Sequence, residues 1–189
     1  LVPPPEYMPM LRDICTRHGV LLIADEVMSG WGRTGEWFAM DHWGVKPDIL
    51  TTAKGITGAY VPLGLCATTA EIAAYFDDHY FSHGHTYEAH PITLKPGVAA
   101  IREMQRLGLV ERARTMGATL ERKRRALQAK NPSIGEVRGL GLFWALDMVK
   151  NRATKEPFNT MRDKVDGKPM VVDRIAADRM KRGVAIAAW

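Results

Sequence analysis

The feature that most constrains the fold of this chain is an apolar run that ends on two acids. Residues 20–24 read Val-Leu-Leu-Ile-Ala, follow Gly19, and lead directly into Asp25 and Glu26. A short continuous apolar run with β-branched members, bounded by a glycine and by acids, is typical of a fully buried strand in a parallel sheet. The sequence therefore predicts such a strand, with Asp25 and Glu26 at its carboxyl end.

Helical and extended patterns alternate along the rest of the chain. Apolar spacing predicts helices over residues 5–18, 70–75, 110–130 and 172–182, and a further helix that ends near residue 107 and begins or kinks at Pro96. Strands are predicted over residues 48–53, 63–68 and 184–189 and within 134–149, with loops at 29–35, 81–88 and 151–169. This alternation predicts an α/β fold of two lobes, divided between residues 107 and 108.

The overall composition argues against several classes of protein. Of the 189 residues, 46% are hydrophobic and 25% are charged, which is ordinary globular usage and argues against disorder. No apolar run approaches the roughly 20 residues of a membrane helix, so no membrane partner is expected. The two cysteines, Cys15 and Cys66, both lie in apolar stretches, so we expect buried, reduced thiols and a cytoplasmic protein.

The net charge of +5 comes from one segment. Residues 101–130 contain nine lysines and arginines against three glutamates, an excess of +6. A basic cluster of this kind can mark a nucleic-acid surface. Because no aromatic residues are interleaved and apolar residues recur at helical spacing, a solvated helix face is the better interpretation, and no nucleic-acid partner is expected.

A lysine follows the next predicted strand along the chain. Lys54 lies in the sequence TTAKGITGAY, next to Gly55 and close to Gly58. Ligands of α/β sheets bind at the carboxyl ends of the strands, so Lys54 and Asp25 are expected to face one crevice. A lysine amine can form a Schiff base with the aldehyde of pyridoxal phosphate, and an acid can keep the pyridine nitrogen of that cofactor protonated. This pair favours a pyridoxal-phosphate site, with Asp25 as a buried anion.

Two other interpretations of these residues stay open at this point. Asp25 and Glu26 could cap turns while Lys54 is simply solvated. The apolar run before two acids also matches a Walker B strand, which holds Mg²⁺ in ATPases. That site needs a GxxxxGK[ST] loop, which does not occur in the chain.

Histidines and arginines near these segments have weaker functional patterns. His83, His85 and His90 are loosely spaced and have no nearby cysteine, so no metal site is expected. Arg33 in GRTG and Arg138 in VRGLG are interpreted as structural rather than as carboxylate ligands.

Four segments, in this order and spacing, carry a family resemblance. They are DEVMSGWGRTG, PDILTTAKGITGAYVPLG, GHTYEAHP and VRGLGLFW. Together they resemble the class III pyridoxal-phosphate aminotransferases of fold type I, and the similarity runs across essentially the whole chain. The C-terminal segments KNRATKEPFN and GKPMVVDRIAADRMKRGV are most similar to taurine–pyruvate aminotransferases.

The resemblance implies a role for four residues. Lys54 would form the Schiff base and act as general base, Asp25 would pair with the pyridinium nitrogen, and Val27 would pack on one face of the ring. Thr86 would bind the cofactor phosphate of the neighbouring subunit, so the active site would belong to a homodimer. Met28 departs from the family pattern, because several members carry a glutamine there that can bond the ring hydroxyl, which a thioether cannot do comparably.

The resemblance also implies a domain assignment. Residues 1–107 would form the C-terminal part of the large cofactor-binding domain with its mostly parallel sheet, and residues 108–189 the truncated small C-terminal α+β domain. The chain would be a fragment covering the second half of an enzyme.

The implied reaction moves an amino group from a primary amine or ω-amino acid, with taurine as one candidate donor, to pyruvate or a similar keto acid. It would proceed by Schiff-base, ping-pong chemistry. One alternative is a truncated, inactive fragment that binds only cofactor or a partner chain. Another is a different class III reaction, such as decarboxylation or a mutase shift, because Lys54 and Asp25 serve those reactions equally.

Overall fold

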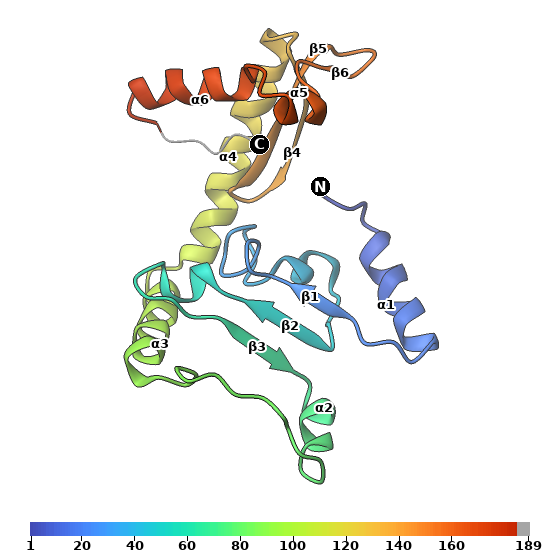
Figure 1. Ribbon diagram of the computed structural model, residues 1–189, viewed down its shortest axis with the longest axis vertical. Helices are drawn as coiled ribbons and strands as arrows, with labels where there is room; N and C mark the ends of the chain where they lie inside the picture. Colours follow the sequence, from blue (N-terminus) through green and yellow to red (C-terminus); the bar gives the residue numbers. More distant parts are fainter. Residues whose placement is uncertain (185–189) are drawn as a thin grey trace. The chain divides into compact units, whose positions relative to one another are not determined.

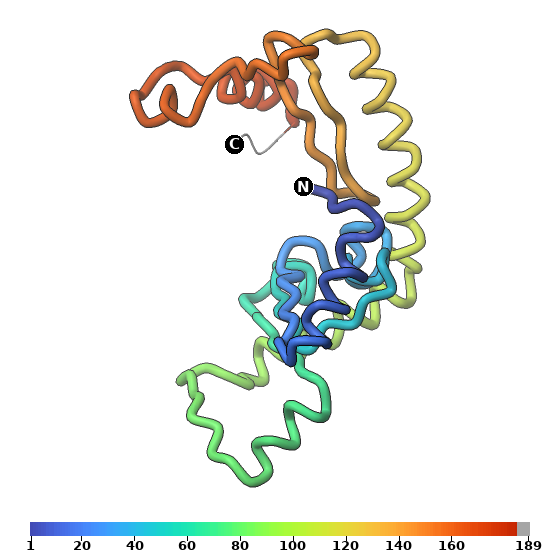
Figure 2. Tube along the Cα trace, turned by 90° about the vertical axis from the view of Figure 1, so that its right-hand side faces the viewer, coloured from blue at the N-terminus to red at the C-terminus, as the bar shows by residue number. Residues whose placement is uncertain are grey.

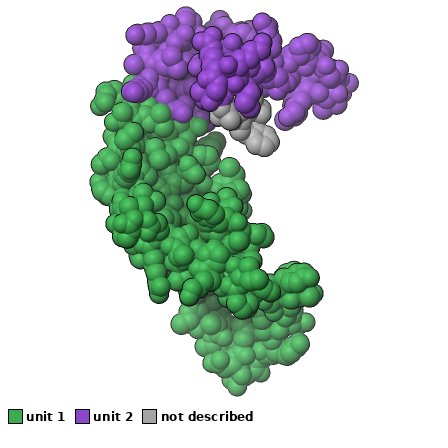
Figure 3. Space-filling model, turned by 90° about the vertical axis from the view of Figure 1, so that its left-hand side faces the viewer, with its two compact units in different colours: residues 1–122, 138–144 green, residues 123–137, 145–189 purple. Residues whose placement is uncertain are grey.

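The computed structural model describes residues 1–184, and the chain in it divides into two compact units (Figure 3). Unit 1 contains residues 1–122 and 138–144, and unit 2 contains residues 123–137 and those from 145 onward. The domain boundary at residues 107 and 108 stays a prediction. None of the helices in the described part of the chain is long and apolar enough to cross a membrane.

Unit 1 is built on a three-stranded sheet with the order β1-β2-β3 (Figure 1). Strand β1 pairs in parallel with β2, as predicted, whereas β2 and β3 are antiparallel, so this sheet is mixed. The helices and strands that lie within unit 1 are α1 (Tyr7–Arg17), β1 (Ile23–Asp25), a 3₁₀ helix (Ala39–Trp43), β2 (Ile49–Thr52), a second 3₁₀ helix (Lys54–Thr57), β3 (Leu65–Thr68), α2 (Ala70–Tyr75) and α3 (Pro91–Arg106).

Strand β1 is shorter and less buried than predicted. Leu22 and Ala24 are buried, but Leu21 and Ile23 are 55% and 59% exposed, so only one face of the run is covered. Successive side chains of a strand point to opposite faces, and β1 lies at the edge of the sheet. The expectation of a fully buried strand was therefore wrong, because a continuous apolar run does not show whether both faces are covered.

The covered face of β1 belongs to the main hydrophobic core of unit 1. The buried members of this core are Cys15, Leu22, Ala24, Met40 and Val45, with Met8, Leu11 and Trp43 packed against them. They come from α1, from β1 and Leu22 just before it, and from the 3₁₀ helix and Val45 just after it, so apolar burial fixes the chain on both sides of β1. Of the two thiols, Cys15 is buried as expected, but Cys66 is exposed, because all four residues of β3 are exposed.

A charged network ties α1 to the starts of the two parallel strands. Asp48 Oδ2 accepts hydrogen bonds from Arg12 Nη1 and from the backbone N–H of Leu22, each at 2.6 Å. The side chains of Arg12 and Asp48 are 23% and 24% exposed, so the pair is partly shielded from solvent. The hydrogen bond from Arg12, followed by that from Leu22, holds the pKa of Asp48 below its ordinary value of 3.8.

We expect Asp48→Asn to lower the free energy of unfolding at pH 7 by about 1–3 kcal/mol, because a hydrogen bond to a charged group is lost. The folded-state pKa of Asp48 is depressed, so its stabilisation is complete above the unfolded-state pKa and is lost as the pH falls through the folded value. Urea unfolding of the parent chain and of Asp48→Asn should show a difference in the free energy of unfolding that is constant from pH 7 to about 5 and shrinks below about pH 4. A difference that grows on acidification would contradict this account.

Two helices follow a long, exposed segment. In both views the chain between α2 and α3 leaves the body of unit 1 as an extended loop (Figures 1 and 2). Helix α3 begins at Pro91, where His90 Nδ1 accepts from the backbone N–H of Ile92 at 3.2 Å, and it includes Pro96. The predicted alternative that this helix starts at Pro96 was therefore wrong, because the N-terminal cap lies at His90.

Helix α4 (Leu109–Lys130) is the basic helix predicted from the sequence. Its buried positions are Ala113 and Gly117, one turn apart, whereas Met116 and Leu127 are 49% and 42% exposed. Small residues, rather than the large apolar ones, thus mark the face that packs most closely. The absence of a nucleic-acid partner stays a prediction.

Unit 2 contains the C-terminal elements of the chain. The second sheet has the order β4-β5-β6, with α5 (Met161–Val165) and α6 (Val171–Lys181) after it. Its strands are β4 (Ile134–Leu140), β5 (Phe143–Asn151) and β6 (Glu156–Pro157). The end of β4 and the start of β5, within residues 138–144, belong to unit 1. Residues 151–169, predicted to be irregular, contain β6 and α5; Thr160 and Asp163 form the capping box that starts α5. The strand predicted at 184–189 falls almost entirely outside the described residues.

Arg152 joins the end of α4 to the start of β4 within unit 2. Its Nε donates to the carbonyl of Ile134 at 3.1 Å, and its Nη2 donates to the carbonyls of Gln128 and Asn131 at 2.7 and 2.8 Å. An arginine here satisfies carbonyl groups at a helix C-terminus that have no partner within the helix.

Candidate active site

The carboxyl ends of β1 and β2 lie side by side. Asp25 is in register with Thr51, and the next residue, Glu26, donates its backbone N–H to the carbonyl of Thr51 at 2.8 Å. Lys54 follows β2 after a single intervening residue and begins the short 3₁₀ helix. Parallel pairing therefore brings Asp25 and Lys54 to the same end of the two strands, as the sequence predicted.

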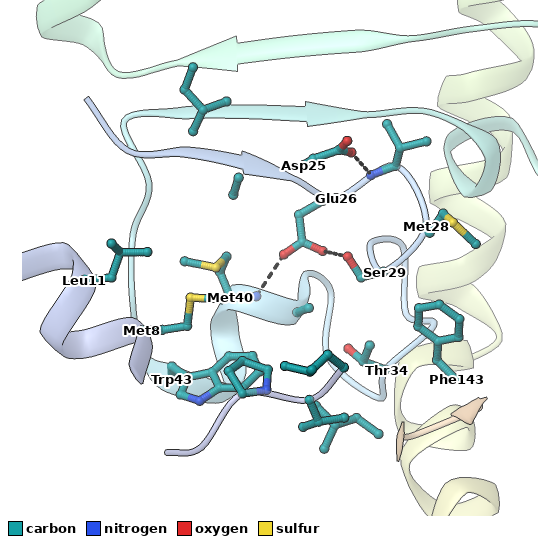
Figure 4. A pocket seen from close by; sticks show the side chains of 18 of the residues that line it. Met8, Leu11, Asp25, Glu26, Met28, Ser29, Thr34, Met40, Trp43 and Phe143 are labelled. Atoms are coloured by element: carbon teal, nitrogen blue, oxygen red, sulfur yellow. Dashed lines mark hydrogen bonds between the residues drawn. The ribbon is translucent and has the colours of Figure 1, made fainter. Parts of the chain in front are cut away.

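Both residues line one pocket of about 680 Å³ (Figure 4). This volume lies within the range of small-molecule sites in proteins. Val27 also lines it, so three of the four predicted site residues share one pocket, whereas Thr86 lies outside it. Its wall is otherwise largely apolar and includes Met8, Leu11, Met40, Trp43, Leu140 and Phe143.

The two acids at the end of β1 point away from each other. Figure 4 shows the carboxylates of Asp25 and Glu26 on opposite sides of the strand. Asp25 is exposed, and its Oδ1 accepts the backbone N–H of Val27 at 3.0 Å in a tight turn. The expectation that Asp25 is the buried anion was wrong, since alternation along the strand buries Glu26 and leaves Asp25 accessible.

Glu26 organises the loop that follows β1. The residue is 2% exposed, and its carboxylate accepts hydrogen bonds from Ser29 Oγ at 2.6 Å and from the backbone N–H of Met40 at 2.8 Å. Sequence reasoning did not assign this role, although the alternation of side chains in a strand could have separated the two acids. Glu26 thereby fixes both ends of the loop between β1 and the 3₁₀ helix.

We expect Glu26→Ala to lower the free energy of unfolding by about 2–4 kcal/mol, because the buried N–H of Met40 loses its acceptor. Glu26→Gln, which keeps an acceptor oxygen of similar size, should cost clearly less. The control is Glu6→Ala, which removes an exposed acid before α1. It should change the free energy of unfolding by less than about 0.5 kcal/mol. Equal losses for the alanine and glutamine variants in urea unfolding would contradict the role of the Met40 hydrogen bond.

Lys54 lies in a backbone conformation that side chains rarely adopt. Its side chain is exposed and its φ is +44°. Such a conformation costs free energy in a residue with a Cβ and persists where the surroundings hold it. The neighbouring Gly55 is tightly packed, because a Cβ built there would lie 2.7 Å from Cβ of Trp31. The glycine beside Lys54 is thus required by close packing against a tryptophan.

The GRTG and RGLG segments pack directly on each other within unit 1. A Cβ on Gly141 would lie 2.2 Å from the backbone carbon of Thr34, and the backbone N–H of Leu142 donates to the carbonyl of Arg33 at 2.9 Å. Thr34 is buried and lines the pocket, and its Oγ1 has no hydrogen-bond partner within the described part of the chain. These backbone contacts give both segments a structural role, whereas the structural interpretation of the Arg33 and Arg138 side chains stays a prediction.

Thr86 and two of the histidines lie in the extended segment between α2 and α3. Thr86 is exposed there, away from the pocket of its own chain. The rings of His83 and His85 are 5.0 Å apart, and no group of three metal-ligating side chains is found among residues 1–184. The role of Thr86 toward a second subunit stays a prediction.

The residues of the pocket fit pyridoxal phosphate in chemical type. An exposed lysine amine and an exposed carboxylate stand at neighbouring strand ends, and Oδ2 of Asp25 has no hydrogen-bond partner among the described residues. Lys54 could hold the aldehyde carbon of the cofactor, and Asp25 could pair with its ring nitrogen. Val27, half-buried on the same wall, supplies an apolar surface for a planar ring.

Comparison with known proteins agrees with this chemistry. The family model described as aminotransferase class-III matches residues 1–187. The chain is 41% identical over 163 residues to a taurine–pyruvate aminotransferase of Bilophila wadsworthia, covering 83% of this chain and 36% of that protein. It is 38% identical over 159 residues to a putrescine–pyruvate aminotransferase of Pseudomonas aeruginosa, covering 84% and 35%.

A solved structure shows the same fold. A taurine:2-oxoglutarate aminotransferase of Bifidobacterium kashiwanohense, in complex with PLP and glutamate, superposes with a TM-score of 0.90 at 35% identity, covering 99% of this chain and 41% of that one. The chain therefore belongs to the class III aminotransferases, and it spans about a third of the length of the two curated relatives.

Proposed function

We propose that this chain carries the catalytic lysine and the cofactor-pairing aspartate of a pyridoxal-phosphate-dependent aminotransferase. The observation that carries the proposal is the placement of Lys54 and Asp25 at the adjacent carboxyl ends of β1 and β2, on the wall of one pocket. When bound, the cofactor supplies an electron sink for proton and amino-group transfer. The family membership of the chain supports the same assignment.

Each residue has a distinct task in this proposal. Lys54 attaches the cofactor and afterwards moves the proton of the substrate as general base. Asp25 holds a proton on the ring nitrogen by an ion pair, and Val27 packs against one face of the ring. Thr86, on the exposed segment before α3, donates its hydroxyl to the cofactor phosphate of a second subunit, so the working unit is a homodimer.

The proposed substrates are a primary amine or ω-amino acid as donor and pyruvate or a similar keto acid as acceptor. Relatives that act on taurine and on putrescine with pyruvate support this class of donor. In a second candidate function the same two residues serve another class III reaction, such as a decarboxylation or a mutase shift. Formation of alanine from pyruvate separates the two, because only an aminotransferase transfers nitrogen to the acceptor.

Cofactor trapping tests the proposal directly. The chain is incubated with pyridoxal phosphate, reduced with borohydride, and digested, and the labelled peptide is located by mass spectrometry. We expect a single adduct on Lys54. In a parallel sample that is not reduced, we expect alanine to form when taurine or putrescine and pyruvate are added. Adducts scattered over surface lysines, or none, would overturn the assignment of the site to this chain.

A further inference from the structure

A buried hydroxyl links the ends of the two parallel strands. Thr52 is the last residue of β2 and is 2% exposed. Its Oγ1 donates to the carbonyl of Glu26 at 3.3 Å and accepts from Nε1 of Trp31 at 2.7 Å. Because Glu26 directly follows Asp25, this one hydroxyl bonds the strand end that carries Asp25 to the strand that leads to Lys54.

The indole that donates to Thr52 also contacts the turn at Lys54. On the backbone of Gly55, a Cβ would lie 2.7 and 3.2 Å from Cβ and Cγ of Trp31, so the indole is packed against the residue after Lys54. Trp31 itself has a φ of +59°, and Lys54 has a φ of +44°. Trp31 and Lys54 thus both have an uncommon backbone conformation, and the contact of Trp31 with Gly55 lies next to Lys54. Such conformations persist only where the surrounding structure holds them.

The aromatic neighbours of Trp31 restrict where its ring can lie. The ring packs edge-on against Phe38, with centroids 5.3 Å apart, and against Trp37 at 6.4 Å. Edge-to-face pairs at these distances are favourable arrangements of aromatic rings. The indole is thus confined by rings on one side, by Gly55 on another and by Thr52 at its nitrogen.

We propose that Thr52 and Trp31 are positioning residues that fix Lys54 relative to Asp25. Neither is assigned a contact with substrate or cofactor; they act through the backbone of Glu26 and of Gly55. The proposal rests on the proposed function for the identity of the two groups being positioned. It predicts that loss of the Thr52–Trp31 hydrogen bond loosens both strand ends together.

Four single variants of the chain test this. Thr52→Val has nearly the same shape but makes neither hydrogen bond, and Thr52→Ser keeps the hydroxyl. Trp31→Phe keeps an aromatic ring against Gly55 but has no N–H to donate. Trp144→Phe is the matched control, because Nε1 of Trp144 donates to the carbonyl of Gly141 instead, at 2.6 Å.

The first readout needs no cofactor. Hydrogen–deuterium exchange is followed in peptides that cover residues 24–30 and 51–57. We expect Thr52→Val and Trp31→Phe to speed exchange about fivefold or more in both segments, because both variants lose the buried hydrogen bond from Trp31 to Thr52. Thr52→Val also loses the bond from Thr52 to the carbonyl of Glu26. Thr52→Ser and Trp144→Phe should exchange like the parent chain. Faster exchange confined to residues 51–57, or no change, would overturn the proposal.

The second readout is the share of trapped cofactor that is found on Lys54. The same two variants should shift label from Lys54 to surface lysines, and Thr52→Ser should restore it. A lower unfolding midpoint with the label still confined to Lys54 would show an ordinary core role and would also overturn the proposal. If the parent chain traps no cofactor on Lys54, the proposed function fails, while the exchange experiment still decides whether the two strand ends are coupled.

Discussion

Lys54→Ala should abolish the cofactor adduct that borohydride traps on this chain. The ε-amine of Lys54 is the group that can bond covalently to the aldehyde, and alanine has no nucleophile. Lys54→Arg should fail equally, although it keeps the positive charge, because a guanidinium stays protonated and does not attack a carbonyl. The measurement is the yield of labelled peptide by mass spectrometry, which should fall to the background of surface lysines in both variants.

Lys46→Ala is the matched control for this experiment. Lys46 is also exposed and lies just before β2, but it does not line the pocket that contains Asp25. Its loss should leave the adduct yield unchanged. An adduct yield that survives in Lys54→Ala, or one that falls equally in both variants, would show that the pocket does not select Lys54.

Asp25→Asn extends the same test to the second group of the site. The substitution keeps the shape of the side chain and its bond to the backbone N–H of Val27 but removes the negative charge. Cofactor affinity should fall roughly tenfold or more, because a charge-assisted hydrogen bond contributes about 1.5–3 kcal/mol. The affinity for pyridoxal phosphate is measured by titration before reduction. If Asp25→Asn leaves it unchanged, Asp25 does not pair with the ring nitrogen of the cofactor.

Gly141→Ala should produce the largest loss of stability among single-methyl additions in unit 1. The added Cβ would lie 2.2 and 2.4 Å from the carbonyl carbon and oxygen of Thr34 and 2.6 Å from the backbone nitrogen of Gly35. All three contacts are with backbone atoms, which cannot rotate away as a side chain can. We expect the free energy of unfolding to fall by about 3 kcal/mol or more, combining steric overlap with the cost of a positive φ.

Gly108→Ala separates the two causes of this loss. Gly108 has a φ of +59°, close to the +53° of Gly141, but a Cβ there would meet nothing within 4 Å. It should therefore cost only about 1 kcal/mol, the price of the backbone conformation alone. Urea unfolding of the two variants should differ by at least about 2 kcal/mol, and equal losses would contradict the tight contact between the GRTG and RGLG segments.

Local patterns predicted the regular elements well where one interaction dominates. The helix at residues 70–75 has the bounds of α2, and the basic segment at 110–130 corresponds to α4. Parallel pairing of the strands that precede Asp25 and Lys54 was also predicted correctly. In these cases helical spacing, a strand-forming run and flanking glycines carry enough information, because hydrogen bonding and propensity act between neighbours in sequence.

Burial at the ends of the strands could not be predicted in the same way. The sequence places Asp25 and Glu26 together, and only the structure shows that the buried carboxylate is that of Glu26. Ala113 and Gly117 similarly replace larger apolar residues as the buried positions of α4. Which face is covered depends on segments far away in sequence, and their packing leaves no local pattern.

By itself, the sequence determined the pairing of a lysine and an aspartate at neighbouring strand ends and the family to which the chain belongs. Only the tertiary structure decided how those ends are held. Thr52, Trp31 and Gly55 meet through contacts between residues more than 20 positions apart. Such contacts form when the chain closes its loops around a shared core, and no spacing rule within one segment encodes them.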